Sequence, residues 1–356
     1  ARYAEQDAKF TWLLWKKYER VLQREGLMDL FEFEMEILDV LMRKEYDGAY
    51  VDRKAMEATR LSYESRKVAV VEDLHANHPI PPTFNFDSPK QKGVLLYEAL
   101  GAPVLKKTKG GEASTDADTL ELLVGKDLGE ASEVAQGFLD YAEVSKTIGT
   151  YFVGMGAKLD GSGYLHPDFT QHVADTNRLS CREPNVHNIP KASDMRDMFV
   201  APPGYAMIGA DYDQIELRFI AVESQDQTMI EVFNSGEDVH RTTAALVLGK
   251  ALSLVTDEER GTYGKMPNFL IGYGGTAYTL AQKAKIPEKE ADKVLTAYFT
   301  RFSRLGPWKE EVYREAMSHV EYRDGKLVVP PYIETMMGYR RRLPDLLLNP
   351  AKAHNN

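Results

Sequence analysis

The chain has 356 residues, enough for two or more domains, and its 43% hydrophobic and 28% charged residues are typical of a globular protein. A single cysteine excludes an internal disulfide framework, and no apolar run approaches the ~20 residues of a membrane helix. The net charge of −10 argues only weakly against a nucleic-acid ligand, because a phosphate-binding groove needs positive charge only locally.

The first predicted element is a helix over residues 1–25. Tyr3 and Asp7 lie one turn apart on one face, and an apolar stripe of Phe10, Leu14 and Tyr18 follows them. By itself this pattern is typical of a helix that packs on a core.

Residues 29–146 have a strongly helical pattern. Asp47-Gly48 ends one predicted helix, and a second is expected over 52–77, where a run of prolines stops it. Ser88 and Pro89 suit the N-cap and first position of the next helix. A basic, glycine-rich loop follows, with lysines at Lys106, Lys107 and Lys109; such a loop is usually solvated.

Residues 163–174 are predicted to form a hairpin of two short strands. The polar stretch 176–190 follows, with neither a helical nor a strand period, and it carries Arg178, Asn185, His187 and Asn188. Arginine and amide side chains presented from turns commonly reach phosphates and minor-groove acceptors. Within the stretch, Cys181 is expected to be a small buried residue.

Residues 205–209 are predicted to form a short apolar strand, followed at once by a helix. Asp211 is then expected at the end of a buried strand, a good place to hold a divalent cation. Asp213 is expected to cap the helix, and Glu216 to lie just inside it. The alternative is an acidic strand end that only caps a helix.

Two later stretches combine charged and aromatic residues. His240 is near the start of a predicted helix, where a lone histidine is usually structural. Lys265, Phe269 and Tyr273 have i, i+4, i+8 spacing, so they share one helix face, and Pro267 is expected to remove a hydrogen bond or bend that helix. An aromatic stripe is usually core, yet a lysine in line with it favours a nucleotide site.

These stretches closely resemble signatures of family A DNA polymerases, the bacterial DNA polymerase I class. Residues 210–218 resemble the first catalytic signature, 176–190 the template-primer contact pattern, and 260–275 the fingers helix. The fold implied is α+β and mostly helical, a right-hand polymerase lacking the last part of the palm. The implied domains are the end of a 3′–5′ exonuclease domain (1–25), the thumb (26–146), the first part of the palm (147–222), the fingers (223–335) and a truncated return toward the palm (336–356).

The resemblance implies roles for individual residues. Asp211 would bridge two Mg²⁺ ions, the Tyr212 carbonyl would bind one of them, and Lys265 would neutralise charge on the triphosphate. Glu216 would exclude a 2′-hydroxyl, so that DNA is the product. The dNTP contacts implied are Gln214, Glu216, His240, Arg260, Lys265, Phe269 and Tyr273. The primer-template contacts implied are Lys106, Lys107, Lys109, Arg178, Asn185, His187, Asn188 and Arg341, and Tyr3 and Asp7 are an exonuclease remnant.

Besides Pro267 inside the fingers helix and Asp213, where the family more often has serine, the chain departs from the family pattern in three places. Gly261 stands where the family has an arginine, and Arg260 is one residue away, about 100° around a helix. His187 stands where the family commonly has glutamine. No His-Asp-Glu, the tripeptide that completes the family's metal site, occurs in the chain.

The sequence therefore predicts a phage-type DNA polymerase in the cytoplasm, or in the host cytoplasm if it is phage-encoded, of which this chain is a central fragment or one subunit of a split enzyme. A further polypeptide would carry the His-Asp-Glu segment, and another could carry the exonuclease core. The alternative is a non-catalytic module that binds primer-template DNA.

Overall fold

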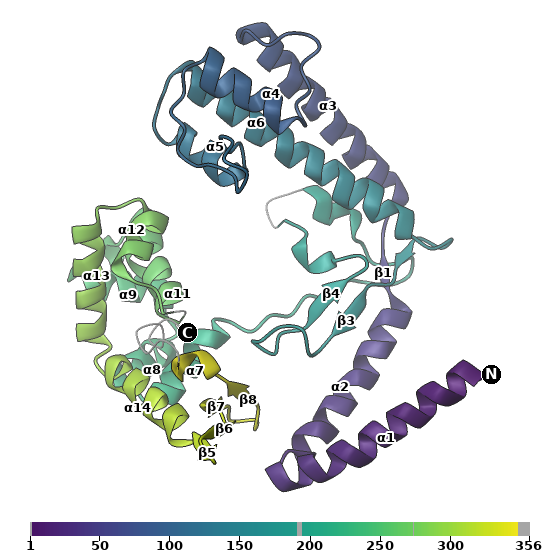
Figure 1. The fold of residues 1–356 in the computed structure, drawn as a ribbon. Coiled ribbons are helices and arrows are strands. Elements are labelled where there is room, and N and C mark those ends of the chain that lie inside the picture. The colour runs from purple at the N-terminus through teal and green to yellow at the C-terminus, as the bar shows by residue number, and fades with distance from the viewer. Residues whose placement is uncertain (1, 191–193, 273, 348–356) are drawn as a thin grey trace. The chain divides into compact units, whose positions relative to one another are not determined.

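The computed structural model describes residues 2–190, 194–272 and 274–347 (Figure 1). They form two units: an internal unit, Phe33–Ile208, and a terminal unit, which joins Ala1–Glu32 to Gly209–Asn356. Each is described by itself. Among the described residues, no helix is both long and apolar enough to cross a membrane.

Long helices with well-defined ends organise the internal unit. Helix α2 (Met28–Asp47) leads into it and ends before Gly48, whose φ of +70° favours glycine. Helix α3 (Arg53–Asn77) begins where Asp52 accepts hydrogen bonds from the backbone N–H groups of the second and third helical residues. Ser88 likewise caps α4 (Pro89–Gly93). These predicted helix boundaries are confirmed.

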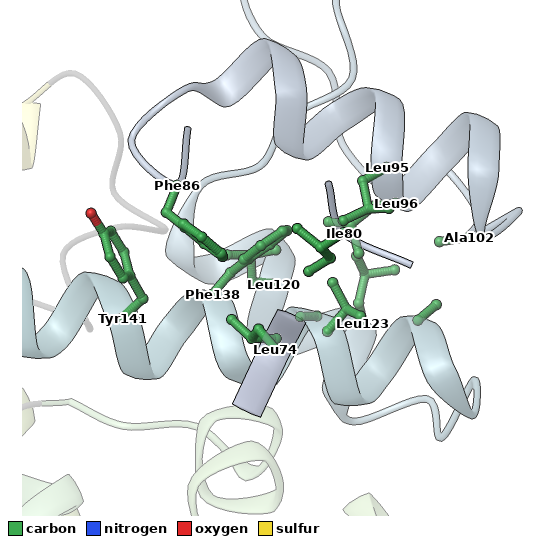
Figure 2. Packing of buried hydrophobic residues seen from close by; sticks show 13 residues of the cluster. Leu74, Ile80, Phe86, Leu95, Leu96, Ala102, Leu120, Leu123, Phe138 and Tyr141 are labelled. Atoms are coloured by element: carbon green, nitrogen blue, oxygen red, sulfur yellow. The ribbon is translucent and has the colours of Figure 1, made fainter. Parts of the chain in front are cut away.

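One core of the internal unit lies between α3 and the helices that follow (Figure 2). These are η1 (Val94–Ala99), α5 (Ala117–Val124) and α6 (Glu130–Thr147). Gly137 lets α3 and α6 approach closely, because a Cβ there would lie 2.5 Å from a methyl carbon of Leu74. The buried side chains are Leu74, Ile80, Phe86, Leu95, Leu96, Ala102, Leu120, Leu123, Ala131, Val134, Ala135, Phe138 and Tyr141.

Four short strands and several single-turn helices complete the internal unit. Strand β1 (Ala49–Tyr50) pairs antiparallel with β2 (Tyr164–Leu165), and β3 (Asp168–Thr170) pairs with β4 (Ser180–Arg182). The helical turns are η2 (Ile148–Gly154), η3 (Gly156–Lys158), η4 (Val186–Asn188) and η5 (Asp194–Met198).

The predicted hairpin over 163–174 is therefore wrong. Its two strands exist, but Pro167, which has no N–H to donate, separates them, and each pairs with a different segment. Cys181 on β4 is buried against Leu41 and Phe169, as predicted.

The terminal unit begins with α1 (Arg2–Glu25) and resumes with a group of helices. Its main core contains Tyr298, Phe302 and Leu280, all fully buried. The predicted apolar stripe of α1 does not join a core: Phe10, Leu14 and Tyr18 are exposed. The helices are α7 (Ile215–Ser224), α8 (Gln227–Asn234), α9 (Val239–Leu248), η6 (Leu252–Leu254), α10 (Asp257–Glu259), η7 (Arg260–Lys265), α11 (Met266–Gly272), α12 (Ala277–Ala284), α13 (Glu288–Arg301) and α14 (Leu305–Ser318).

Two antiparallel hairpins and a short turn follow α14. Strand β5 (Glu321–Arg323) pairs with β6 (Lys326–Val329), and β7 (Tyr332–Glu334) pairs with β8 (Arg340–Arg342), before η8 (Pro344–Leu347). Arg340 donates a hydrogen bond of 3.0 Å to the carbonyl oxygen of Glu25, which ties β8 to the end of α1.

Candidate nucleotide and DNA-binding site

Asp211 lies in an exposed loop, and the strand predicted before it does not form. Residues 205–210 have no regular secondary structure, and Tyr205 and Ile208 are 78% and 90% exposed. A strand is stable only when another strand satisfies its backbone groups, and no described residue pairs with this stretch. The expectation of a buried strand ending at Asp211 is therefore wrong.

The start of α7 also differs from the prediction. Gln214, in the left-handed region with φ 50°, occupies the cap position, and it makes no side-chain cap hydrogen bond. Asp213 does not cap the helix. Arg218, one turn along α7, donates to the Asp213 carbonyl oxygen at 2.8 Å and to its carboxylate at 3.3 Å. Glu216 lies in the first turn of α7, as predicted.

The metal ligands available in the described residues are few. Asp211 supplies one exposed carboxylate, and Tyr212 supplies a backbone carbonyl. Nowhere in residues 2–190, 194–272 and 274–347 do three His, Cys, Asp or Glu side chains gather closely enough to hold a metal ion. Because Mg²⁺ sites rely on carboxylates and a two-ion site needs them on both sides, these residues alone do not fit two Mg²⁺ ions.

The helix that carries Lys265 begins with α10 and continues directly into a π-helical turn, η7. The N–H of Met266 bonds to the carbonyl oxygen of Gly261, five residues back, so this turn holds one more residue than an α-helical turn. The regular helix α11 resumes at Met266, next to Pro267, which has no N–H to donate. In an α-helix Arg260 and Lys265 would be about 140° apart, and the wider turn brings them nearer to one face.

Arg260 is held at the start of α9 by Asp238. One carboxylate oxygen of Asp238 accepts the backbone N–H groups of His240 and Arg241, both at 2.9 Å, and the other accepts Arg260 Nε at 2.8 Å. Burial is the largest single effect on Asp238 and opposes its ionisation. The hydrogen bonds from Arg260 and from the two backbone N–H groups, together with the charge of Arg260, outweigh burial and hold the pKa of Asp238 below its usual value. The positive end of the α9 dipole and a guanidinium therefore lie together.

Gly264 allows α9 and η7 to cross at close range. A Cβ at this position would lie 1.9 Å from the carbonyl oxygen of His240, so no other residue fits without moving the backbone. The crossing also sets the His240 ring 5.7 Å from the ring of Phe269. The relative position of His240 and Phe269, two residues of the predicted nucleotide site, thus depends on Gly264.

The predicted nucleotide face of the fingers helix is exposed where it is described. Lys265 and Phe269 are both exposed, whereas the neighbouring residues Pro267 and Asn268 are buried. A packed core stripe would show the opposite pattern. Tyr273 lies outside the described residues, so its predicted place on this face is not described.

Among the predicted nucleotide contacts His240 differs from Lys265 and Phe269, because it is buried and only 2% exposed. Burial, together with the positive charges of Arg260 and Lys265, lowers its pKa, while Asp238 and Asp213 oppose the shift. The sequence contained no signal for its buried surroundings, which come from α11 and α13, distant segments of the chain.

In the internal unit, the predicted primer-template residues lie in and around β4 and η4. Asn185 caps η4 by accepting the N–H of His187 at 3.1 Å, and the carbonyl of Asn188 accepts the Tyr151 hydroxyl at 2.6 Å. The side chains of Arg178, Asn185, His187 and Asn188 are exposed. These contacts fix the backbone and leave polar side chains at the surface.

His187 also contacts aromatic and basic neighbours. Its ring lies 5.5 Å from that of Phe169, whose ring in turn contacts Lys44 Nζ at 3.9 Å. Burial and the charge of Lys44 lower the pKa of His187. At neutral pH the residue therefore offers hydrogen bonds rather than a charge.

The lysines of the basic loop are not equivalent. Lys106 pairs with Asp116 at 2.7 Å and lies 3.7 Å from Asp118, so its charge is largely neutralised within the loop. Lys107 forms an isolated bridge with Ala113 through its backbone, and its side chain is exposed, as is that of Lys109. Two of the three predicted DNA contacts thus keep an accessible charge.

The three arginines of β8 lie on two different faces of the strand. Arg340 pairs with Glu334 at 2.6 Å, and Arg342 lies 3.4 Å from Glu25. Arg341 lies between them and is exposed; because side chains alternate along a strand, it occupies the opposite face.

Near the start of the chain, Tyr3 is exposed on α1 one turn from Asp7, and their predicted exonuclease origin stays a prediction.

Comparison with known proteins agrees with this arrangement. The sequence pattern of DNA polymerase family A matches residues 53–356. DNA polymerase I of Pseudomonas aeruginosa is 34% identical, over 97% of this chain and 36% of that protein, and DNA polymerase I of Caldicellulosiruptor bescii is 35% identical, over 94% and 38%.

A solved structure, the POL domain of Pol1 from M. smegmatis in complex with DNA primer-template and dNTP, matches with a TM-score of 0.79 and 31% identity, covering 95% of this chain and 57% of that one. The predicted fold, mostly helical and part of a polymerase domain, is confirmed. The chain spans little more than a third of the length of the curated relatives it matches. It belongs to DNA polymerase family A.

Proposed function

We propose that the chain takes part in template-directed DNA synthesis, adding dNTPs to a primer 3′ end with release of pyrophosphate. The observation that carries this proposal is the exposed face of Lys265 and Phe269 beside Arg260 at the start of α9. Two cations and a helix N-terminus suit a triphosphate, and an exposed aromatic ring suits a sugar or base. Residues 26–146 serve as thumb, 147–222 as part of the palm and 223–335 as fingers.

Each part of the nucleotide has a proposed contact. Lys265, Arg260 and His240 bind the triphosphate, Phe269 lies against the sugar, and Tyr273 lies under the base. Gln214 also contacts the nucleotide. Glu216, in the first turn of α7, excludes a 2′-hydroxyl, which makes the product DNA.

Primer-template DNA is bound through separate residues. Arg178, Asn185, His187 and Asn188 contact the primer and template near β4, Lys107 and Lys109 contact phosphates from the basic loop, and Arg341 faces the template. Lys106 contributes less, because its charge is already paired.

Catalysis needs a second carboxylate beyond Asp211. We infer that it comes from a His-Asp-Glu segment, which these 356 residues do not contain. Asp211 and the Tyr212 carbonyl are this chain's share of the metal ligands.

The second candidate is a non-catalytic module that grips primer-template DNA. It is favoured by the single carboxylate around Asp211 and by the absence of a metal-binding cluster among the described residues. It would not need Lys265 and Phe269 on an exposed face, so dNTP binding separates the two candidates.

The test is primer extension with the purified chain, alone and mixed with a polypeptide that carries the His-Asp-Glu segment. The chain alone should extend primers negligibly, and the mixture should extend them. Asp211→Asn in the mixture should abolish addition while leaving primer-template affinity within about threefold, because DNA is held through phosphate contacts elsewhere. Activity within about tenfold of the parent would remove Asp211 from catalysis.

A further inference from the structure

A buried network of four polar side chains lies behind the start of α9. Asn268 Nδ2 lies 3.0 Å from His240 Nδ1 and 3.1 Å from Thr243 Oγ1, and the Tyr298 hydroxyl lies 3.0 Å from Asn268 Oδ1. Each of the four residues is at most 2% exposed. The network joins three helices, α9, α11 and α13.

The partners of Asn268 decide which way its amide is oriented. Thr243 Oγ1 lies 2.7 Å from the carbonyl oxygen of Val239 and 3.4 Å from Asn268 Oδ1. Its single proton forms the much shorter bond to Val239, so its oxygen is left to accept. Tyr298 donates to Oδ1, and the two amide protons then serve Thr243 and His240. With the amide reversed, Oδ1 would face the Thr243 oxygen, whose proton is already used, and one buried contact would join two acceptors.

This orientation determines the state of the imidazole. An amide N–H directed at His240 Nδ1 requires that nitrogen to be an unprotonated acceptor, so the ring proton is on Nε2. Protonation of Nδ1 would set two donors against each other in a buried site. The surroundings of the ring also favour the neutral imidazole. Burial and the positive charges of Arg260 and Lys265 lower the pKa of His240, and together they outweigh the opposing effect of Asp238 and Asp213.

We propose that Asn268, itself oriented by Thr243, is a positioning residue that holds His240 uncharged with its proton on Nε2. The consequence rests on the proposed function: His240 gives the triphosphate a single directed N–H donor, and the positive charge comes from Arg260 and Lys265. The division has a physical advantage: a neutral donor fixes the position of the phosphates without adding a third cation that would slow pyrophosphate release.

The test is ¹⁵N NMR of the full chain labelled at histidine, with the His240→Gln variant used to assign the signal. The expected spectrum at neutral pH has an unprotonated Nδ1 and a protonated Nε2 for His240. Asn268→Asp places a carboxylate beside Nδ1, which should protonate it and raise the pKa of His240 by about 1 to 3. Thr243→Val, which removes the hydroxyl that orients the amide, should give a mixture of tautomers.

A parent spectrum with the proton on Nδ1, or a Thr243→Val spectrum unchanged from the parent, would overturn the proposal. These two measurements decide it even where Asn268→Asp does not fold. Binding of a dNTP to the same samples tests the other claim separately. If Asn268→Asp changes the tautomer and leaves dNTP affinity unchanged, the positioning stands and the role of His240 at the triphosphate fails.

Discussion

The close crossing of α9 and η7 makes Gly264 the most sensitive position in the candidate nucleotide site. In Gly264→Ala, the new Cβ would lie 1.9 Å from the His240 carbonyl oxygen, where ordinary contact begins at 3.4 Å. The atom in its way belongs to the backbone, so no side-chain rotation relieves the clash. The two helices must separate by roughly 1.5 Å, the difference between those distances.

The cost follows from two opposing effects. Overpacking of a rigid contact costs up to ~3 kcal/mol. Replacing a helical glycine with alanine returns ~0.5–1 kcal/mol through the unfolded state. The unfolding free energy should therefore fall by ~2 kcal/mol. Because His240 and Lys265 lie on the two separating helices, dNTP affinity should also fall, by about tenfold for each ~1.4 kcal/mol by which the binding free energy weakens.

Gly261→Ala is the matched control, since Gly261 lies in the same π-helical turn and a Cβ there meets nothing within 4 Å. It should be neutral or stabilising by up to ~1 kcal/mol. Urea unfolding followed by fluorescence of Trp308, which packs against the core of this unit, measures both variants. If the two unfold at the same urea concentration, α9 and η7 do not cross as closely as described.

Three further predictions concern single side chains. Glu216→Ala should admit ribonucleotides by opening the space over the 2′ carbon; unchanged selection of dNTP over rNTP would place the steric gate elsewhere. Because the pKa of His240 is lowered from 6.5, the unfolded chain binds more protons below that pH, and stability falls as the pH falls through this window. His240→Gln should therefore lose less unfolding free energy than the parent between pH ~7 and ~5, and parallel curves would contradict the burial argument. Lys109→Ala should lower the salt dependence of primer-template binding by about one ion, and the paired Lys106→Ala by less; equal slopes would show that the pairing with Asp116 does not hold on DNA.

Local signals in the sequence predicted local structure well. Asp52 and Ser88 cap their helices as expected, because a cap needs only the next three residues. Strand pairing was predicted wrongly, because it depends on distant segments: β3 pairs with β4 across a loop, and residues 205–209 find no strand partner among the described residues. Asp213 is not the cap because α7 begins one residue later than expected, with Gln214 at the cap position, and the Asp213 carboxylate instead accepts a hydrogen bond from Arg218.

In the candidate site, too, local features could be predicted from the sequence and contacts between distant segments could not. The spacing of Lys265 and Phe269 predicted a shared, exposed helix face, since both lie on one element. The surroundings of His240 could not be predicted, because Asn268 and Tyr298 come from other helices and look like ordinary polar residues in the sequence. Gly264 gave only a weak signal, a glycine inside a helical pattern.

The π-helical turn bears on the one departure from the family pattern that sequence reasoning left open. Arg260 is five residues before Lys265, where the family pattern has an arginine four residues before the lysine. An insertion of one residue in a regular α-helix would rotate Arg260 by about 100° away from that face. A turn closed by an i to i−5 hydrogen bond holds the extra residue locally, so the helix on either side keeps its register.

Deletion of Gly261 tests this compensation. The deletion leaves four residues from the arginine to the lysine, restores α-helical spacing and should convert η7 to an α-helical turn. If the π-helical turn already places Arg260 beside Lys265, dNTP affinity should stay within about threefold of the parent, whereas Arg260→Ala should lose about tenfold or more. The deletion should also raise stability, since a helical glycine costs ~0.5–1 kcal/mol. A gain of about tenfold or more in dNTP affinity on deletion would mean that Arg260 is out of line in the parent. No change in affinity for either variant would mean that the Asp238 contact, and not the triphosphate, is what Arg260 serves.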